Sequence, residues 1–145
     1  MSLTPVARWA RPCLPLLLCA SVAVPLNAFA QSLKSGEQVY KETCFACHGT
    51  KVEKAPQLGD KKVWAPLIKE GQHVLTAHAW VGVRNMPPRG GKADLSLEEF
   101  ARAVAYMARA SGGTWKDPDA AMLKRIQAEE KARIAALKSG AKPKP

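Results

Sequence analysis

The chain has 145 residues, about one domain's worth, of which 47% are hydrophobic and 23% are charged. This is ordinary globular composition, and it excludes wholesale disorder, collagen and fibrous coiled coils. The charge is unusual, because 22 Lys and Arg residues outnumber 12 Asp and Glu residues and give a formal net charge of +10. We therefore expect any partner to present an acidic or phosphate-bearing surface.

Residues 1–30 have the pattern of a secretory signal peptide. Arg8 and Arg11 form a basic start, an apolar run covers residues 14–24, and Ala28-Phe29-Ala30 has the small-x-small pattern of a cleavage site. A retained membrane anchor is the alternative, but the run is shorter than the roughly 20 residues that cross a bilayer, and prolines interrupt it. We therefore expect export to the periplasm, with cleavage before Gln31.

Cleavage at this point would change the cysteine count and the charge. Cys13 and Cys19 would be lost, Cys44 and Cys47 would be the cysteines of the mature chain, and 20 basic against 12 acidic side chains would give +8. Lipid attachment at Cys19 is disfavoured, because Leu18 before it is larger than lipoprotein processing usually accepts. In an oxidising compartment, a lone cysteine pair indicates a redox-active disulfide, part of a metal site or a haem attachment point.

The residue after the pair decides among these, because Cys44-Phe45-Ala46-Cys47-His48 is the C-x-x-C-H signature of c-type haem attachment. On one helical turn, two such thiols can add to both vinyl groups of one porphyrin, and the histidine can take the iron from one side. A thioredoxin-like dithiol would normally follow a strand, and no strand pattern precedes Gly36. A zinc site would need a fourth ligand from His73 or His78, and no second C-x-x-C pair exists.

An electron carrier fills both axial positions of its iron, so a second ligand is expected. Met86 is the best candidate, because it lies 38 residues after His48 and directly before two prolines. Proline fixes φ and restricts its predecessor, so this methionine is predicted on a stiff extended loop that can hold a thioether over iron. Met107 and Met122 fall in helical patterns and are expected to pack in the core.

Ligation by two histidines is the alternative, with His73 or His78 in place of Met86. These histidines are five residues apart, which is not the i, i+4 spacing that places two ligands on one helical face. We expect surface or packing roles for both.

The spaced motifs resemble those of the class I c-type cytochromes of the cytochrome c5 family. The resemblance covers about residues 33–112 and rests on Gly36-x-x-Val39-Tyr40, the C-x-x-C-H motif, Ala55-Pro56-x-Leu58-Gly59-Asp60, Trp64, Met86-Pro87-Pro88-Arg89-Gly90-Gly91 and Ala103-Val104-x-Tyr106-Met107.

The resemblance implies a small all-α fold wrapped around one covalent haem c and a role as a one-electron carrier. It also implies that Pro56 offers its carbonyl to the Nδ1 proton of His48, as ligating histidines generally have an outer-shell acceptor. Trp64 is expected to pack near the haem edge.

Helix signals agree with this fold class independently. Ser35 and Gln38 form a capping box for a helix at 36–47, Asp60 can cap a helix at 61–69, and the pattern at 72–81 predicts a third. A second capping box, Ser96 with Glu99, opens a helix that runs to Gly112 and carries apolar residues at helical spacing: Leu97, Phe100, Val104 and Met107. No hairpin signal joins two strand-like runs, so the fold is predicted to be all-α.

Residues 116–145 form a charged extension beyond the predicted monohaem domain at 31–115. Ala, Lys, Arg and Glu dominate residues 119–138 and favour a helix, with a thin apolar stripe of Met122, Ile126, Ile134 and Leu137. The Lys/Pro tail at 139–145 is expected to be disordered. Four roles stay open for the helix: docking on the domain, binding a partner helix or enzyme, contact with an anionic membrane surface, or no particular function.

These features predict a soluble periplasmic electron carrier rather than an enzyme. One alternative is a cytochrome c subunit docked on a periplasmic dehydrogenase or oxidase. Another is a haem enzyme such as a peroxidase, but it would need an open iron site and polar distal groups, which a Met-Pro-Pro loop does not supply.

The basic surplus predicts the kind of partner. Lys51, Lys54, Lys61 and Lys62 follow the haem-attachment motif and are expected to steer association with an acidic patch on a redox protein. Nucleic acid is not expected, because the chain is predicted to be exported and lacks interleaved aromatic and basic residues.

Overall fold

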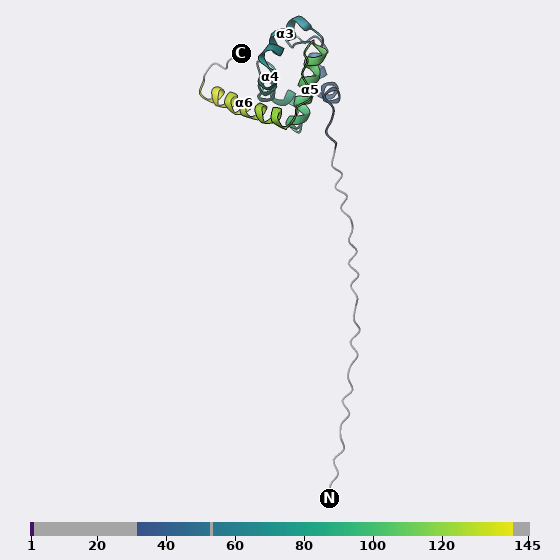
Figure 1. The fold of residues 1–145 in the computed structure, drawn as a ribbon, viewed down its shortest axis with the longest axis vertical. Helices are drawn as coiled ribbons and strands as arrows, with labels where there is room; N and C mark the ends of the chain where they lie inside the picture. The colour runs from purple at the N-terminus through teal and green to yellow at the C-terminus, as the bar shows by residue number, and fades with distance from the viewer. Residues whose placement is uncertain (2–31, 53, 141–145) are drawn as a thin grey trace. The chain divides into compact units, whose positions relative to one another are not determined.

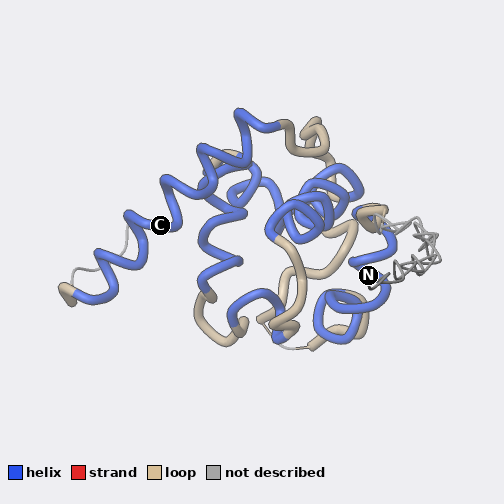
Figure 2. The backbone as a smooth tube through the Cα atoms, turned by 90° about the horizontal axis from the view of Figure 1, so that it is seen from below, coloured by secondary structure: helices blue, strands red, loops and turns tan. Residues whose placement is uncertain are grey.

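A computed structural model describes residue 1 and residues 32–52 and 54–140. All but the first residue of the predicted signal peptide, its cleavage site before Gln31 and the last five residues of the tail lie outside these described residues. Within them every regular element is a helix, as Figure 2 shows, and the all-α prediction is confirmed. No helix in this described part is long and apolar enough to span a membrane.

The first helical segment carries the haem-attachment motif at its end. It consists of α1 (Gly36–Val39), a π-helical stretch η1 (Tyr40–Cys44) and α2 (Phe45–His48), where the sequence predicts a single helix over 36–47. The predicted capping box is present, with Ser35 N–H donating to the Gln38 side chain at 2.8 Å. The π-helical stretch widens the helix up to and including Cys44, and no pattern in the sequence predicts it.

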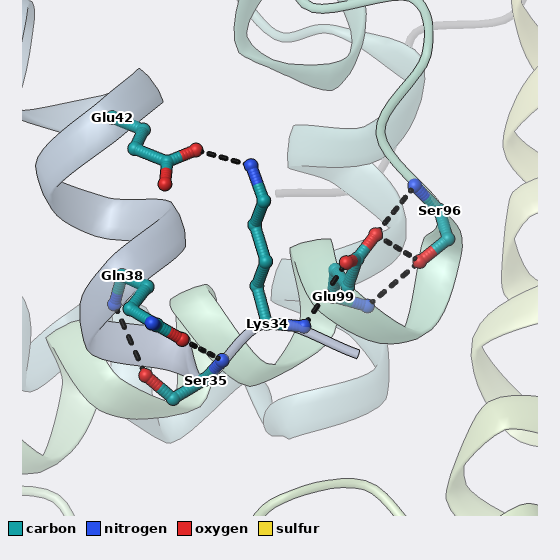
Figure 3. Close-up of polar contacts among 6 residues, drawn as sticks. All are labelled: Lys34, Ser35, Gln38, Glu42, Ser96 and Glu99. Carbon is teal, nitrogen blue, oxygen red and sulfur yellow. Dashed lines mark hydrogen bonds and ion pairs between the residues drawn. The ribbon is translucent and has the colours of Figure 1, made fainter. Parts of the chain in front are cut away.

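This segment packs against α5 (Leu97–Ala110). The backbone N–H of Lys34 donates to Oε1 of Glu99 at 3.1 Å, and Glu99 also completes the capping box of Ser96, as Figure 3 shows. These carboxylate contacts lower the pKa of Glu99, with the Ser96 side chain as the largest cause. One residue thereby caps α5 and anchors the chain entering α1.

Helices α3 (Lys61–Glu70) and α4 (Gln72–Val81) lie where the sequence predicts them. Asp60 caps α3 by accepting from the backbone N–H groups of Lys62 and Val63. Gly71 and Gly82 follow the two helices with φ values of 97° and 99°, a region that favours glycine. The middle of α4 is buried on several sides, because both α5 and α6 pack against it.

Helix α6 (Ala120–Lys138) begins at its Asp119 cap and packs against α4; both helices are labelled in Figure 1. Ile126 is fully buried in a small cluster with Ala77 and Ala101. Of the roles left open for the extension, the structure shows docking on the domain. The helix is not freely solvated. The predicted apolar stripe is only partly used, because Leu137 is 48% exposed and the last turns extend past the other helices (Figure 2).

Candidate functional site

The two cysteines of the C-x-x-C-H motif lie three residues apart on the first helical segment and are both free thiols. Cys44 ends η1 and is buried, whereas Cys47 in α2 is exposed. Burial, with a smaller contribution from Cys47, raises the pKa of the Cys44 thiol to about 11. The described residues before the pair, 32–43, form no strand, which disfavours the thioredoxin-like alternative.

The imidazole of His48 is buried at the end of α2 and oriented by a backbone carbonyl. Its Nδ1 lies 2.8 Å from the carbonyl oxygen of Pro56. A carbonyl only accepts, so Nδ1 carries the proton and Nε2 keeps a lone pair. The backbone N–H of Leu58 donates to the carbonyl of His48 at 2.8 Å and fixes the same loop from the other side. This tautomer is the one that a histidine needs in order to bind a metal through Nε2.

Gln57 holds the loop between these two contacts against the cysteine motif. Its Nε2 donates to the carbonyl oxygens of Cys47 at 3.1 Å and Ala55 at 2.8 Å. Its Oε1 accepts from the backbone N–H of Lys51 at 2.8 Å. No sequence pattern predicts this role for Gln57, because a glutamine in a polar loop is common. Its proximity to the Ala-Pro motif is the one signal that could have identified it.

Trp64 is buried in α3, with 3% of its surface exposed, and belongs to the main hydrophobic cluster. Its indole N–H donates to the carbonyl oxygen of Gln57 at 2.9 Å. The indole thereby supports the loop that orients His48. Contact between Trp64 and a haem edge stays a prediction.

Met86 lies on a short reversal of the chain after α4. The backbones of Val83 and Met86 exchange two hydrogen bonds, at 3.1 and 2.9 Å. Pro87 is extended, with φ of −69° and ψ of 157°, but the chain then turns through a 3-10 helix, η2 (Pro88–Gly91). The extended loop predicted here is therefore limited to the first proline, since left-handed Arg89 and Gly90 bend the rest.

The Met86 loop and the cysteine motif lie close together. A Cβ added to Gly90 would be 3.3 Å from Cγ2 of Thr43, which directly precedes Cys44. Both Met86 and Cys44 also belong to the main core, in which Met86 is partly buried. Segments that are some 40 residues apart in the sequence are thus brought to one region.

The donor set of this region fits a covalently attached iron porphyrin. It offers two unpaired thiols at C-x-x-C spacing, an imidazole with an unprotonated Nε2, and a thioether on an anchored loop. These are the groups that attach haem c and fill both axial positions.

Of the two histidines considered as alternative iron ligands, His78 lies beside two glutamates. Nδ1 of His78 lies 3.7 Å from Oε2 of Glu70, and Nε2 lies 3.6 Å from Oε1 of Glu129. His73 is partly exposed on the same helix. Among residues 32–52 and 54–140, no group of three or more His, Cys, Asp and Glu side chains is placed to hold a metal ion. The geometry therefore favours packing roles over zinc ligation for these histidines.

The lysines singled out in the sequence are exposed on two neighbouring segments. Lys51 and Lys54 belong to the loop that Gln57 ties to the cysteine motif, and Lys61 and Lys62 form the first turn of α3. The stem of Lys61 runs beside Gly112, just beyond the end of α5. The four charges therefore flank the loop that positions His48.

Three comparisons with known proteins agree on one family. The family described as cytochrome c oxidase, cbb3-type, subunit III matches residues 31–107. Cytochrome c-555 of Chlorobaculum tepidum is 38% identical over 95 residues, which cover 63% of this chain and 88% of the relative. Cytochrome c5 of Azotobacter vinelandii is 38% identical over 76 residues, which cover 51% and 92%.

A solved structure that contains a cytochrome c has a similar fold. A chain in the crystal structure of an electron transfer complex of nitrite reductase with cytochrome c is 43% identical and superposes with a TM-score of 0.50. The match covers 52% of this chain and 93% of that one.

Proposed function

Since the chain belongs to this family of c-type cytochrome domains, as a class I member of the cytochrome c5 type that carries haem c, we propose that it is an exported one-electron carrier in which His48 and Met86 would bind the iron. Cys44 and Cys47 would hold the haem through thioether bonds. The relatives and the solved neighbour are cytochromes c, which support electron transfer rather than substrate chemistry.

When bound, haem c supplies reversible one-electron chemistry at its iron. The protein's part is to hold its ligands in fixed positions. Pro56 keeps the His48 ring in one tautomer and orientation, and the Val83–Met86 hydrogen bonds fix the backbone that carries the thioether. Ligands held in this way need little rearrangement between oxidation states, which suits a carrier.

The observation that carries this proposal is the His48–Pro56 hydrogen bond within an intact C-x-x-C-H motif. The purified protein is expected to keep its haem when extracted with acidified organic solvent and to titrate as a single one-electron couple. Its reduced form is expected to be inert toward carbon monoxide. Haem that extracts and leaves free thiols, or rapid carbon monoxide binding, would contradict the proposal.

Export follows from the signal pattern at residues 1–30, and the mature chain would then begin at Gln31. The expected location is the periplasm, where haem c proteins meet their redox partners. Mass spectrometry of the native protein checks this directly. An intact Arg8–Arg11 region on the purified protein would show that the segment is retained.

The proposed partner is a redox protein with an acidic surface. The basic residues around the His48 loop support it, and so does a neighbour crystallised in a complex with nitrite reductase. A permanently docked subunit is the second candidate, favoured by the family description as an oxidase subunit. Purification from a native periplasm-plus-membrane extract separates the two, because a free carrier elutes alone and a subunit elutes with its enzyme.

A further inference from the structure

An aromatic side chain, Trp80, links helix α6 to the Met86 loop. This residue lies near the end of α4, with 7% of its surface exposed. Its indole Nε1 donates to Oε1 of Glu130, in the middle of α6, at 3.0 Å. Trp80 is therefore one of the residues through which the extension makes a directed polar contact with the domain, alongside the pairing of His78 with Glu129.

Arg89 of the Met86 loop lies over the face of the Trp80 ring. The guanidinium carbon of Arg89 lies 4.5 Å from the ring centroid, within the range of a cation–π interaction. Phe100 of α5 packs against the same indole with ring centroids 5.3 Å apart and an interplanar angle of 64°. The indole is thus fixed by the core and by Glu130, and Arg89 rests on it.

Arg89 is a strained residue that needs such support. Its φ of 55° is in the left-handed region, which a non-glycine side chain adopts at a cost. Besides the contact with Trp80, its Nη1 donates to the carbonyl oxygen of Ala93 at 2.7 Å. Arg89 lies three residues after Met86, so the contacts that hold it also limit the movement of the methionine loop.

We propose that Trp80 is a positioning residue for Met86, and that Glu130 of α6 fixes it. The C-terminal helix thereby restrains the Met86 loop, which would keep the thioether in place as an iron ligand. This inference rests on the proposed ligation by Met86. It assigns the extension a function within the haem site itself, apart from any docking of partners.

The rate at which external imidazole binds to the ferric protein tests the proposal, because imidazole enters when the Met86 loop opens. Glu130→Ala is expected to raise this rate about five-fold, the equivalent of one lost hydrogen bond. Glu130→Gln keeps an accepting oxygen and is expected to stay near the wild-type rate. Glu129→Ala is the matched control, because Glu129 neighbours it on α6 but faces His78.

A double-mutant cycle separates positioning from general loosening of the helix. Arg89→Ala is also expected to raise the imidazole rate, and the double variant with Glu130→Ala is expected to be less than multiplicative, because both residues act through Trp80. A fully multiplicative double variant, or equal rates for Glu130→Ala and Glu129→Ala, would overturn the proposal.

Met86→Ala distinguishes a failure of the Trp80 bridge from a failure of the proposed ligation by Met86. If this variant binds imidazole rapidly while Glu130→Ala and Glu129→Ala behave alike, the bridge through Trp80 is refuted and the ligand assignment stands. If Met86→Ala binds imidazole no faster than the wild type, Met86 is not the ligand and both proposals fail.

Discussion

Gly36 in α1 lies directly against the carbonyl of Arg102 in α5. A Cβ added at Gly36 would be 2.2 Å from that oxygen and 3.0 Å from Cβ of Tyr106. No side chain larger than the hydrogen of glycine fits at position 36 unless α1 and α5 move apart. Because α1 leads through η1 into the cysteine motif, this crossing also sets where the attachment site begins.

Gly36→Ala is therefore expected to destabilise the protein by about 1–3 kcal/mol, the usual cost of overpacking a tight contact. Chemical denaturation of the haem-loaded protein measures the change. Glu37→Ala, at an exposed position of the same helix, is the control and should alter the free energy of unfolding by a few tenths of a kcal/mol. Equal effects of the two substitutions would show that the crossing is not tight in solution.

Docking of α6 predicts that replacing two isoleucines of that helix by alanine lowers the free energy of unfolding by clearly different amounts. Ile126→Ala removes a fully buried side chain and is expected to cost about 2–5 kcal/mol of unfolding free energy. Ile134→Ala, where the side chain is only partly buried, is expected to cost clearly less. If neither substitution changes the unfolding midpoint, α6 is not docked in solution.

His78 predicts a pH dependence of stability. Burial and, to a smaller extent, Arg133 lower its pKa below the ordinary value of 6.5, while Glu70 and Glu129 partly oppose the shift. The unfolded state thus binds this proton more readily, so the associated stability is complete above about pH 6.5 and is lost as pH falls through the lower folded-state pKa.

His78→Gln removes this titration. The free energy of unfolding of the wild type is expected to fall more steeply below pH 6.5 than that of the variant, as denaturation at a series of pH values would reveal. His73→Gln, on the same helix but partly exposed, serves as the control. Parallel pH profiles for the wild type and His78→Gln would contradict the expected role of burial.

Electrostatic steering predicts that second-order electron transfer to an acidic redox partner slows as salt rises from low to physiological strength. Reversing Lys51, Lys54, Lys61 and Lys62 to Glu should slow transfer at low salt without changing the haem spectrum. The charge-matched control reverses four exposed residues of α6: Lys124, Arg125, Lys131 and Lys138. A rate that is indifferent to salt and to the first set of reversals excludes steering by this surface.

The helices could be predicted from the sequence because their signals are local. Ser35, Asp60 and Ser96 all act as the caps that their positions predict. The haem motif is likewise local, since C-x-x-C-H is contiguous. Such features depend on a few neighbouring residues, whose chemistry can be read directly.

The remaining parts of the site depend on contacts between distant segments. Nothing near Trp80 indicates that Glu130, 50 residues later, accepts its N–H. Gln57 likewise has four backbone neighbours that only the folded loop brings together. The turn after Pro87 likewise has no local signal, since left-handed Arg89 lies over the ring of Trp80, which belongs to another helix.

The spectrum of the ferric protein, compared between the wild type and single-ligand variants, tests the ligation most directly. Met86→Ala is expected to abolish the near-infrared band of thioether-bound ferric haem, open the iron to external ligands and lower the midpoint potential, because thioether coordination favours Fe(II). His73→Ala and His78→Ala are expected to leave the band in place. An unchanged spectrum for Met86→Ala, together with an altered one for either histidine variant, would contradict the account.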